Sequence, residues 1–453
     1  MLNQKAILTV VCSLLLVFFG IIQVQGKASS EIENLEKEFG GYSVSLTSTF
    51  DVSSGGRLVM QDLVGQVVIK GITGNKVTIV EKFFFDVDTE KEAESAFERY
   101  RAKIKQSGDR ITVTGNDSNR RRYVTTSYDV TVPAKFNVAV ETIGGDVRVQ
   151  VIEGEVVLET MGGDLELTDV IGSIDAETAG GDINVQGLEG EARLSTAGGD
   201  IDLISAKKGP YRLRTAGGDI TLRTIEGKLD AETSGGDVEV SDVTGDVDLG
   251  TSGGDIEISN VKGSSHRAKT SGGDVDANEI TGDVDLSTSG GDVSAMLING
   301  SVYGRTSGGN IDINDVNGDV DVSTSGGSLD IKSVMGRIQG KTSGGDVFAR
   351  VQGNGMLKAP IRLSTSGGEI TLQLPSKTKA TVEAQIRTHD PYSGYNVHSD
   401  FKLKIEEDTQ KGKKDSGWGR GYYIITATGE INGGGPLIEL ETVEGDINIE
   451  IRD

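Results

Sequence analysis

Residues Thr233–Val238 read TSGGDV, and close variants of this hexapeptide recur down most of the chain. The variants include TAGGDI, TSGGDI and TSGGNI, and successive copies are about 18 residues apart. A fixed period of this kind is the signature of a repeat architecture, in which each repeat stacks on its neighbours. The first glycine of each pair falls at Gly144, Gly162, Gly180, Gly198, Gly217, Gly235, Gly253, Gly272, Gly290, Gly308, Gly326, Gly344 and Gly367.

The residues between two glycine pairs alternate apolar and polar side chains, which is the period of a β-strand. Val247 and Leu249 alternate with Asp246 and Asp248. Each half-repeat therefore predicts one short strand and one corner, and stacking would pair each strand with its counterpart about 4.8 Å away. The predicted fold is all-β, a parallel β-solenoid (right-handed β-helix) of about 18 residues per coil. The half-repeat favours two main sheets. An extra apolar position such as Val243 is compatible with a short third side, so two and three sides are both alternatives.

Each residue type of the corner sequence has a physical role in the predicted fold. Glycine allows a positive φ or the close approach of two backbones. The preceding threonines would form a ladder whose hydroxyls hydrogen-bond along the array. The aspartates would form a ladder of like charges, which repel in water by about 1 kcal/mol per pair.

Two arrangements would relieve this repulsion. Turn N–H groups can cap the carboxylates, or calcium ions can lie between them. The position becomes Asn310, Ser328 and Glu369 in three repeats, and Asn and Ser can still cap a turn although they lack the charge. Capping is therefore favoured, and the alternative is a calcium ladder. The carboxylates of that ladder would be Asp237, Asp255, Asp274 and Asp292.

The N-terminus predicts export. Lys5 precedes an apolar run that extends to about Val24, and small or polar residues follow from Gly26. This pattern is typical of a secretory signal peptide, and an uncleaved membrane anchor is the alternative. The only cysteine, Cys12, lies inside the run, so the mature chain would contain no disulfide.

The remaining organisation follows from shifts in periodicity. Helical spacing within Thr89–Gln106 predicts one amphipathic helix of about five turns, and Glu31–Phe39 could form one or two helical turns. The predicted segments are a signal peptide (1–26), an N-terminal β-rich segment containing the amphipathic helix (27–135), solenoid repeats (136–374), and C-terminal β strands that cap the last coil (375–453).

The composition excludes several functions and supports no catalytic site. A net charge of −24 argues against nucleic-acid binding and against adsorption to anionic lipid. His266 is interpreted as a surface or turn residue, and a metal pair of His389 and His398 has no supporting cluster. Acidic residues are so abundant that a pair at catalytic distance means little, and no nucleophile has a regularly placed base. We expect no cofactor and no enzymatic activity.

One segment combines basic charge with aromatic residues. Lys411–Tyr423 contains Trp418, Arg420 and Tyr422, a composition that suits a ligand-binding loop. The alternative is a hairpin tip leading into a strand that covers the open end of the solenoid.

The segments YDVTVPAKFNVAVETIGGDV (Tyr128–Val147) and GEINGGGPLIELETVEGDINIEI (Gly429–Ile451), with the Gly-Asp repeats between them, carry a family resemblance. Together with the export signal, they resemble the bacterial putative-adhesin family of exported β-strand-repeat proteins. The resemblance implies a β-helical exported protein without a recognised active site.

The sequence therefore predicts a non-enzymatic exported scaffold or adhesin-like binding protein that presents long solenoid faces. The first alternative is an extracellular enzyme acting on polysaccharides, and the second is a calcium-, ice- or mineral-binding ladder protein. The expected partner is an envelope protein or a glycan, and membrane contact would occur only through an uncleaved N-terminal segment. The expected location is the periplasm, the cell surface or the medium.

Overall fold

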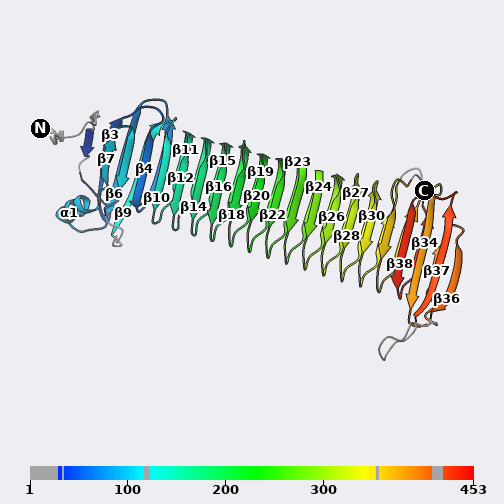
Figure 1. Cartoon of the computed structure of the whole chain (residues 1–453). Helices are drawn as coiled ribbons and strands as arrows, with labels where there is room; N and C mark the ends of the chain where they lie inside the picture. Colours follow the sequence, from blue (N-terminus) through cyan, green and yellow to red (C-terminus); the bar gives the residue numbers. More distant parts are fainter. Residues whose placement is uncertain are drawn as a thin grey trace, which may run out of the picture. The chain divides into compact units, whose positions relative to one another are not determined.

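The computed structural model describes residues 29–32, 35–116, 123–352, 357–390, 392–410 and 422–452. It contains two compact units, unit 1 (Met1–Gly227) and unit 2 (Lys228–Asp453). The predicted signal peptide and Cys12 lie outside the described residues. Figure 1 shows the strands of each unit side by side, as the predicted β-solenoid requires.

Unit 1 opens with antiparallel strands and continues as parallel coils. Strand β3 pairs antiparallel with β1, β2 and β6, and β6 pairs antiparallel with β9. Its elements are β1 (Ser29–Ile32), β2 (Glu36–Glu38), β3 (Gly41–Asp51), β4 (Arg57–Leu63), β5 (Gln66–Ile72), β6 (Lys76–Phe85), α1 (Glu90–Tyr100), β7 (Lys103–Ser107), β8 (Arg110–Thr114), β9 (Val124–Pro133), β10 (Asn137–Thr142), β11 (Val147–Glu153), β12 (Val156–Thr160), β13 (Leu165–Ile171), β14 (Ile174–Thr178), β15 (Ile183–Glu189), β16 (Ala192–Thr196), β17 (Ile201–Lys207), β18 (Tyr211–Arg214) and β19 (Ile220–Glu226).

The helix α1 packs its apolar side against the opening sheet. Thr89 and Glu92 form a capping box at its N-terminus, and Phe97 makes an edge-on ring contact with Phe83 of β6. The helix has 11 residues, so the expectation of about five turns was too long. Ile104 lies in β7, where pairing with β8 replaces the helical hydrogen bonds. The helical turns expected within Glu31–Phe39 were also wrong, because β1 and β2 pair there with β3.

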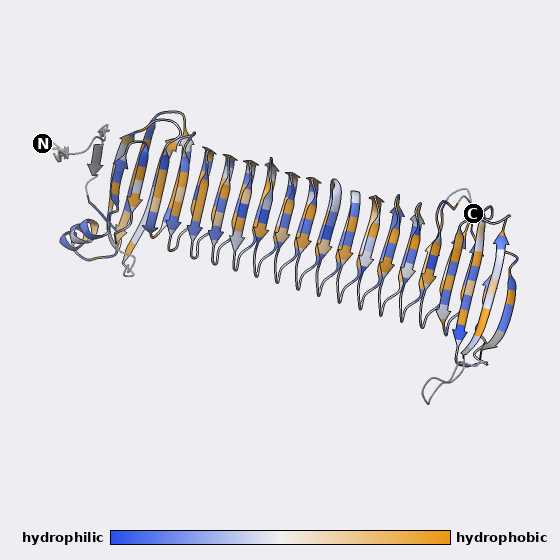
Figure 2. Ribbon diagram, in the orientation of Figure 1, coloured by the Kyte–Doolittle hydropathy of each residue, from blue (hydrophilic) through white to orange (hydrophobic). Residues whose placement is uncertain are grey.

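In the coils of unit 1 each strand pairs in parallel with the strand two elements later. Leu165 of β13 is the partner of Ile183 of β15, 18 residues further along the chain. The apolar residues of each strand are buried and the polar ones face outward, which Figure 2 shows as alternating bands of hydropathy. Burial of stacked Val, Ile and Leu side chains supplies the main stabilising free energy of each coil.

Unit 2 repeats this arrangement and ends in additional strands. Its elements are β20 (Leu229–Glu232), β21 (Val238–Thr244), β22 (Val247–Gly250), β23 (Ile256–Lys269), β24 (Val275–Ser287), β25 (Val293–Asn299), β26 (Val302–Arg305), β27 (Ile311–Val316), β28 (Val320–Ser323), β29 (Leu329–Val334), β30 (Ile338–Lys341), β31 (Val347–Arg350), β32 (Ile361–Ser364), β33 (Ile370–Leu374), β34 (Ala380–Thr388), β35 (Val397–Ser399), β36 (Lys404–Gln410), β37 (Tyr422–Ile431), β38 (Leu437–Val443) and β39 (Ile447–Ile451). Strands β34, β36 and β37 form an antiparallel group, and β34 joins the solenoid by parallel pairing with β38.

From β11 to β29, the first strand of each coil is interrupted by a bend at one residue with positive φ, and the residues after it resume the ladder as a short third side. In β21 the bend falls at Asp242, which has φ +57°, and the ladder resumes with the buried Val243. Equivalent residues with positive φ recur through both units, Leu297 in β25 among them. The parallel β-solenoid is therefore confirmed, and its short third side is observed. Right-handedness and the segment boundaries inferred from the sequence stay predictions.

Candidate functional site

The threonine that precedes each glycine pair is buried and holds two corners together. In unit 2, the Thr251 hydroxyl donates to the Gly236 carbonyl of the preceding corner (2.8 Å) and accepts from the Gly254 N–H (3.3 Å). Thr251 is 7% exposed, so its hydroxyl faces the interior. The predicted hydrogen bonding along the array is confirmed. The ice- or mineral-binding alternative would need an outward-facing threonine ladder, which these buried residues do not provide.

The aspartate after each glycine pair caps the next corner. Asp237 Oδ1 accepts from the Asp255 N–H (2.8 Å), and Asp255 Oδ1 accepts from the Asp274 N–H (2.8 Å). The side-chain oxygens of Asn310 and Ser328 make the same bond to the following corner, at 2.9 and 3.1 Å. Capping is thus observed whether the side chain is charged or neutral. Among the described residues, no group of three or more His, Cys, Asp or Glu is placed to hold a metal ion.

His266 lies in the core, which corrects the expectation of a surface or turn residue. It is 1% exposed and occupies the inward position held by Val247 and Val284 in the adjacent coils. Its Nε2 lies 3.1 Å from the Thr281 carbonyl, and its Nδ1 is buried without a hydrogen-bond partner. The glycine pairs that bound this coil are 19 residues apart, one more than usual. Aligning the repeats on their glycines therefore places His266 at an outward position.

The remaining sequence candidates do not converge on one site in the described residues. Trp418 and Arg420 lie outside those residues, and for Tyr422 only the backbone, which begins β37, is described. His389 and His398 are both exposed. Lys208, between β17 and β18, forms an ion pair with Glu189 of β15.

One outward face of unit 2 is acidic. It follows the first strand of each coil, and Ser294 interrupts its line of carboxylates. Desolvation raises the pKa of Asp276, a hydrogen bond with Ser294 lowers it, and the nearby carboxylates of Asp274 and Asp255 raise it further. The acidic face comprises Glu239, Glu257, Asp276, Asp312 and Asp330.

The second strand of each coil carries a different pattern. At the position immediately before the buried threonine, exposed cations alternate with serines from coil to coil. We call this line of side chains the cation column, and consecutive members are direct partners in the parallel ladder. The cation column comprises Lys269, Ser287, Arg305, Ser323, Lys341 and Ser364.

A second line runs beside the cation column, two residues earlier in each strand. We call it the tyrosine column. Its member Arg267 pairs with Asp285 across adjacent coils, with Nε and Oδ2 3.5 Å apart. The tyrosine column comprises Arg267, Asp285, Tyr303, Asp321, Gln339 and Arg362.

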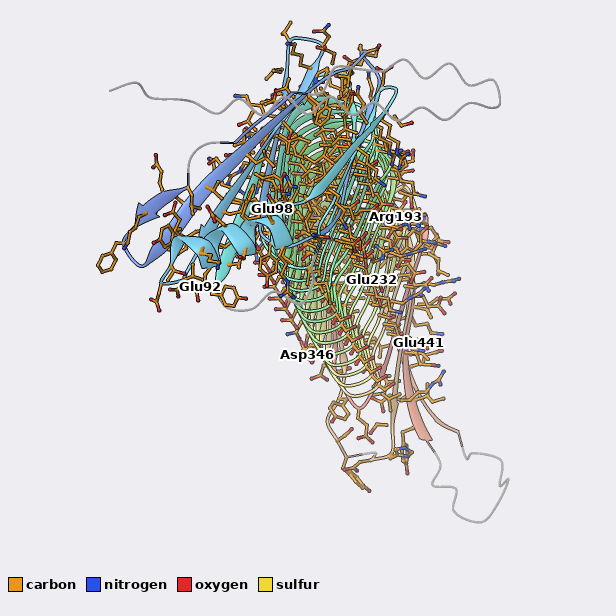
Figure 3. The ribbon with its side chains drawn as sticks, turned by 90° about the vertical axis from the view of Figure 1, so that its left-hand side faces the viewer. Glu92, Glu98, Arg193, Glu232, Asp346 and Glu441 are labelled. Carbon is orange, nitrogen blue, oxygen red and sulfur yellow. The ribbon has the colours of Figure 1, made fainter. Side chains whose placement is uncertain are left out.

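Two hollows open where short side chains lie between long ones. The first, of about 290 Å³, is lined by Tyr303, Arg267, Arg305 and Asp285, among others. The second, of about 390 Å³, has a lining that includes Lys341. Figure 3 looks at the stacked strands from the end and shows side chains projecting from them. Glu441, labelled in its lower right part, is the ladder partner that follows Ser364 of the cation column. Shallow hollows in which polar groups converge, as in both of these, are candidate ligand-binding positions, and the first also contains an aromatic ring.

A chain of stacked parallel coils with buried threonines and capped aspartates at glycine corners is a β-solenoid repeat protein. The model of the Toastrack DUF4097 family matches residues 74–245 and 211–326. Because these matches together span more than half of the 453 residues, the chain belongs to the Toastrack DUF4097 family. The family inferred from the sequence is thereby confirmed.

Two solved structures are similar to this chain at low identity. One is "a putative cell adhesion protein" from Clostridium sporogenes ATCC 15579, with 10% identity, a TM-score of 0.14 and coverage of 94% of this chain and 100% of the other. The second is "a putative adhesin" from Bacteroides fragilis NCTC 9343, with 14% identity, a TM-score of 0.19 and coverage of 66% and 95%. No curated protein matches the sequence.

None of the described helices has both the length and the apolarity to cross a bilayer.

Proposed function

We propose that the protein is a non-enzymatic exported scaffold, an adhesin-like protein that binds an envelope protein or a glycan through its solenoid faces. The observation that carries the proposal is the direct ladder pairing of outward side chains, such as Lys269, Ser287 and Arg305. Backbone hydrogen bonds hold these side chains at fixed intervals of about 4.8 Å. A surface whose chemical groups are already in place loses little conformational entropy when it binds a partner.

The corners support the same proposal because they favour rigidity. Threonine and aspartate side chains link each corner to its neighbour, and the glycine pair contributes no side chain that could contact a substrate. A uniform row of corners is suited to supporting long faces rather than to assembling one catalytic constellation.

Binding is tested by probing purified protein against an array of glycans and envelope proteins. Retention of a partner without chemical change is the expected result. The enzymatic alternative is tested by incubating polysaccharides with catalytic amounts of the protein and measuring new reducing ends. Multiple turnovers would contradict the proposal, and so would a failure to retain any partner.

Export is tested by isolating the protein from its native cells and sequencing its N-terminus. We expect a start near Lys27, outside the cytoplasm. An intact N-terminus on cytoplasmic protein would contradict export.

A further inference from the structure

We propose that the cation column and the tyrosine column of unit 2 together bind an extended acidic polysaccharide that carries one anionic group per disaccharide. This inference rests on the proposed function, because it assigns a ligand class to one face of the scaffold. The acidic face lies on the other main strand of each coil and would repel such a ligand.

The cations of the cation column are regularly spaced. Lys269, Arg305 and Lys341 lie two coils apart from one another, with one serine between each neighbouring pair. Two strand spacings amount to about 9.6 Å, which is close to the length of an extended disaccharide. A polysaccharide lying across the strands would therefore bring an anionic group to every second coil.

The cations are also available. All three are exposed, and none of the described carboxylates forms an ion pair with them. The column contains no acidic residue between Lys269 and Ser364, although the whole chain carries a charge of −24. Positive charge that is unpaired on an acidic protein attracts an anionic ligand to this face.

The intervening coils offer groups suited to a neutral sugar. Beside Ser287 and Ser323 lie Asp285 and Asp321 of the tyrosine column. Carboxylates and hydroxyls accept hydrogen bonds from sugar hydroxyls. In the coil of Arg305, the Tyr303 ring, 38% exposed, offers an aromatic surface against which the apolar face of the charged sugar can pack. Alternating cationic and hydrogen-bonding coils thus match alternating charged and neutral sugars.

The core beneath these columns repeats with the same two-coil period. The inward residue is small in the coils that carry a cation and large in the coils that carry a serine. A Cβ on Gly340 would lie 3.1 Å from Leu363 Cδ2, so neighbouring side chains fill the space that the glycine leaves. The two-coil repeat of the surface cations therefore coincides with a two-coil repeat in the size of the buried residues. The small residues are Ala268, Gly304 and Gly340, and the large ones are Leu286, Val322 and Leu363.

The same spacing argues against an acidic peptide. Side chains on one face of an extended peptide recur at about 6.7 Å, twice the rise per residue. That interval does not fit cations about 9.6 Å apart. An acidic polypeptide would therefore meet the cation column out of register.

The test measures calorimetric affinity for four probes. They are hyaluronan oligosaccharides, in which glucuronate alternates with a neutral sugar, polygalacturonate with a carboxylate on every sugar, neutral chitin oligosaccharides, and polyglutamate. We expect hyaluronan to bind most tightly, with an affinity that falls as salt rises because exposed charges are screened. Polyglutamate or polygalacturonate binding as tightly as hyaluronan, or no binding of hyaluronan, would overturn the inference.

Three variants separate spacing from net charge, with circular dichroism confirming that each is folded. Removing the cations in K269S/R305S/K341S should weaken hyaluronan binding at least tenfold. S323K/K341S keeps the charge but moves one cation by one coil, and should weaken binding about threefold or more. K262S/K332S/R350S removes the same charge from other sides of the unit and should change binding less than twofold. An unchanged affinity in either of the first two variants would overturn the inference.

Failure of this inference is distinguishable from failure of the proposed function. If the glycan and protein array retains a partner but the column variants do not alter that binding, the scaffold stands and the ligand class is wrong. If no partner is retained and a polysaccharide is turned over, the scaffold itself is wrong.

Discussion

A Cβ atom on Gly163 would stand 2.1 Å from the carbonyl oxygen of Gly145, the equivalent glycine one coil earlier. The second glycine of each pair is therefore required by the close approach of two backbones. The first glycine of this pair is different, because a Cβ on Gly162 would meet no atom within 4 Å.

These adjacent glycines form a matched pair for mutagenesis. Gly163→Ala should lower the free energy of unfolding by about 1–3 kcal/mol, as overpacking does. Gly162→Ala should leave it unchanged or raise it by about 0.5 kcal/mol, because alanine reduces the entropy of the unfolded chain. Urea denaturation measures both. Equal effects of the two substitutions would refute the distinction between the glycines.

The bend within each coil predicts a stabilising substitution. Val151 is a β-branched residue with φ +58°, whereas Gly187 holds the equivalent position with φ +74°. A left-handed conformation costs a non-glycine residue about 1–2 kcal/mol. Val151→Gly should therefore raise the free energy of unfolding by about 1 kcal/mol, measured by urea denaturation. The exposed Ile171, which lies in regular strand conformation, provides the control: Ile171→Gly should lower it by about 1 kcal/mol.

At the corners that contain a glycine pair, the caps predict that the hydrogen-bonding shape of the side chain matters more than its charge. Asp255→Asn should retain the hydrogen bond to the Asp274 N–H and leave stability nearly unchanged, as the natural Asn310 indicates. Asp255→Ala should lower the free energy of unfolding by about 1 kcal/mol, because the N–H loses its partner. Thermal unfolding with and without a chelator measures both effects. A marked loss of stability in the chelator would instead support the calcium ladder.

The corners could be predicted from the sequence because the same hexapeptide recurs where the same geometry recurs. Threonine burial, aspartate capping and close glycine approach all follow from stacking one motif on itself. The bends could not be predicted, because residues as different as Val151, Asp242 and Leu297 adopt the same positive φ. Tertiary packing imposes that conformation against their local preference.

His266 and the cation column were missed although the sequence contains their signal. Relative to the threonine that precedes each glycine pair, His266 precedes Thr270 by four residues, as the inward Val247 precedes Thr251. The residue directly before the threonine reads Lys, Ser, Arg, Ser, Lys, Ser over six successive coils. Counting from the glycines obscured His266, because its coil is one residue longer than the usual 18.

The size alternation of the core predicts a compensating pair of substitutions. Gly340→Val should lower the free energy of unfolding by about 1–3 kcal/mol through overpacking. Leu363→Ala should lower it by about 2–5 kcal/mol through cavity formation. Because the two residues are direct partners in the parallel ladder, the double variant should cost less than the sum of the single ones. Additive losses in a double-mutant cycle would show that the volumes do not compensate.

The acidic face predicts a stability that depends on pH through Asp276. Desolvation is the main cause that raises the pKa of this carboxyl in the folded state. As pH rises, Asp276 loses its proton at a lower pH in the unfolded state than in the folded state. The free energy of unfolding therefore falls as pH rises from about 3.9 through the folded pKa. Asp276→Asn should raise the free energy of unfolding at pH 7, and this gain should disappear below about pH 3.9.

Asp246 provides the opposite control for Asp276. Hydrogen bonds from the backbone N–H groups of Ser264 and Ser265 lower its pKa in the folded state. Ionised Asp246 therefore stabilises the folded state at neutral pH, and this stabilisation is lost as pH falls through the folded pKa. Asp246→Asn should lower the free energy of unfolding at pH 7. The two variants should therefore shift the urea midpoint in opposite directions at pH 7, and the shifts should converge on zero in acid. Shifts of the same sign would refute the assignment of desolvation to one carboxyl and capping to the other.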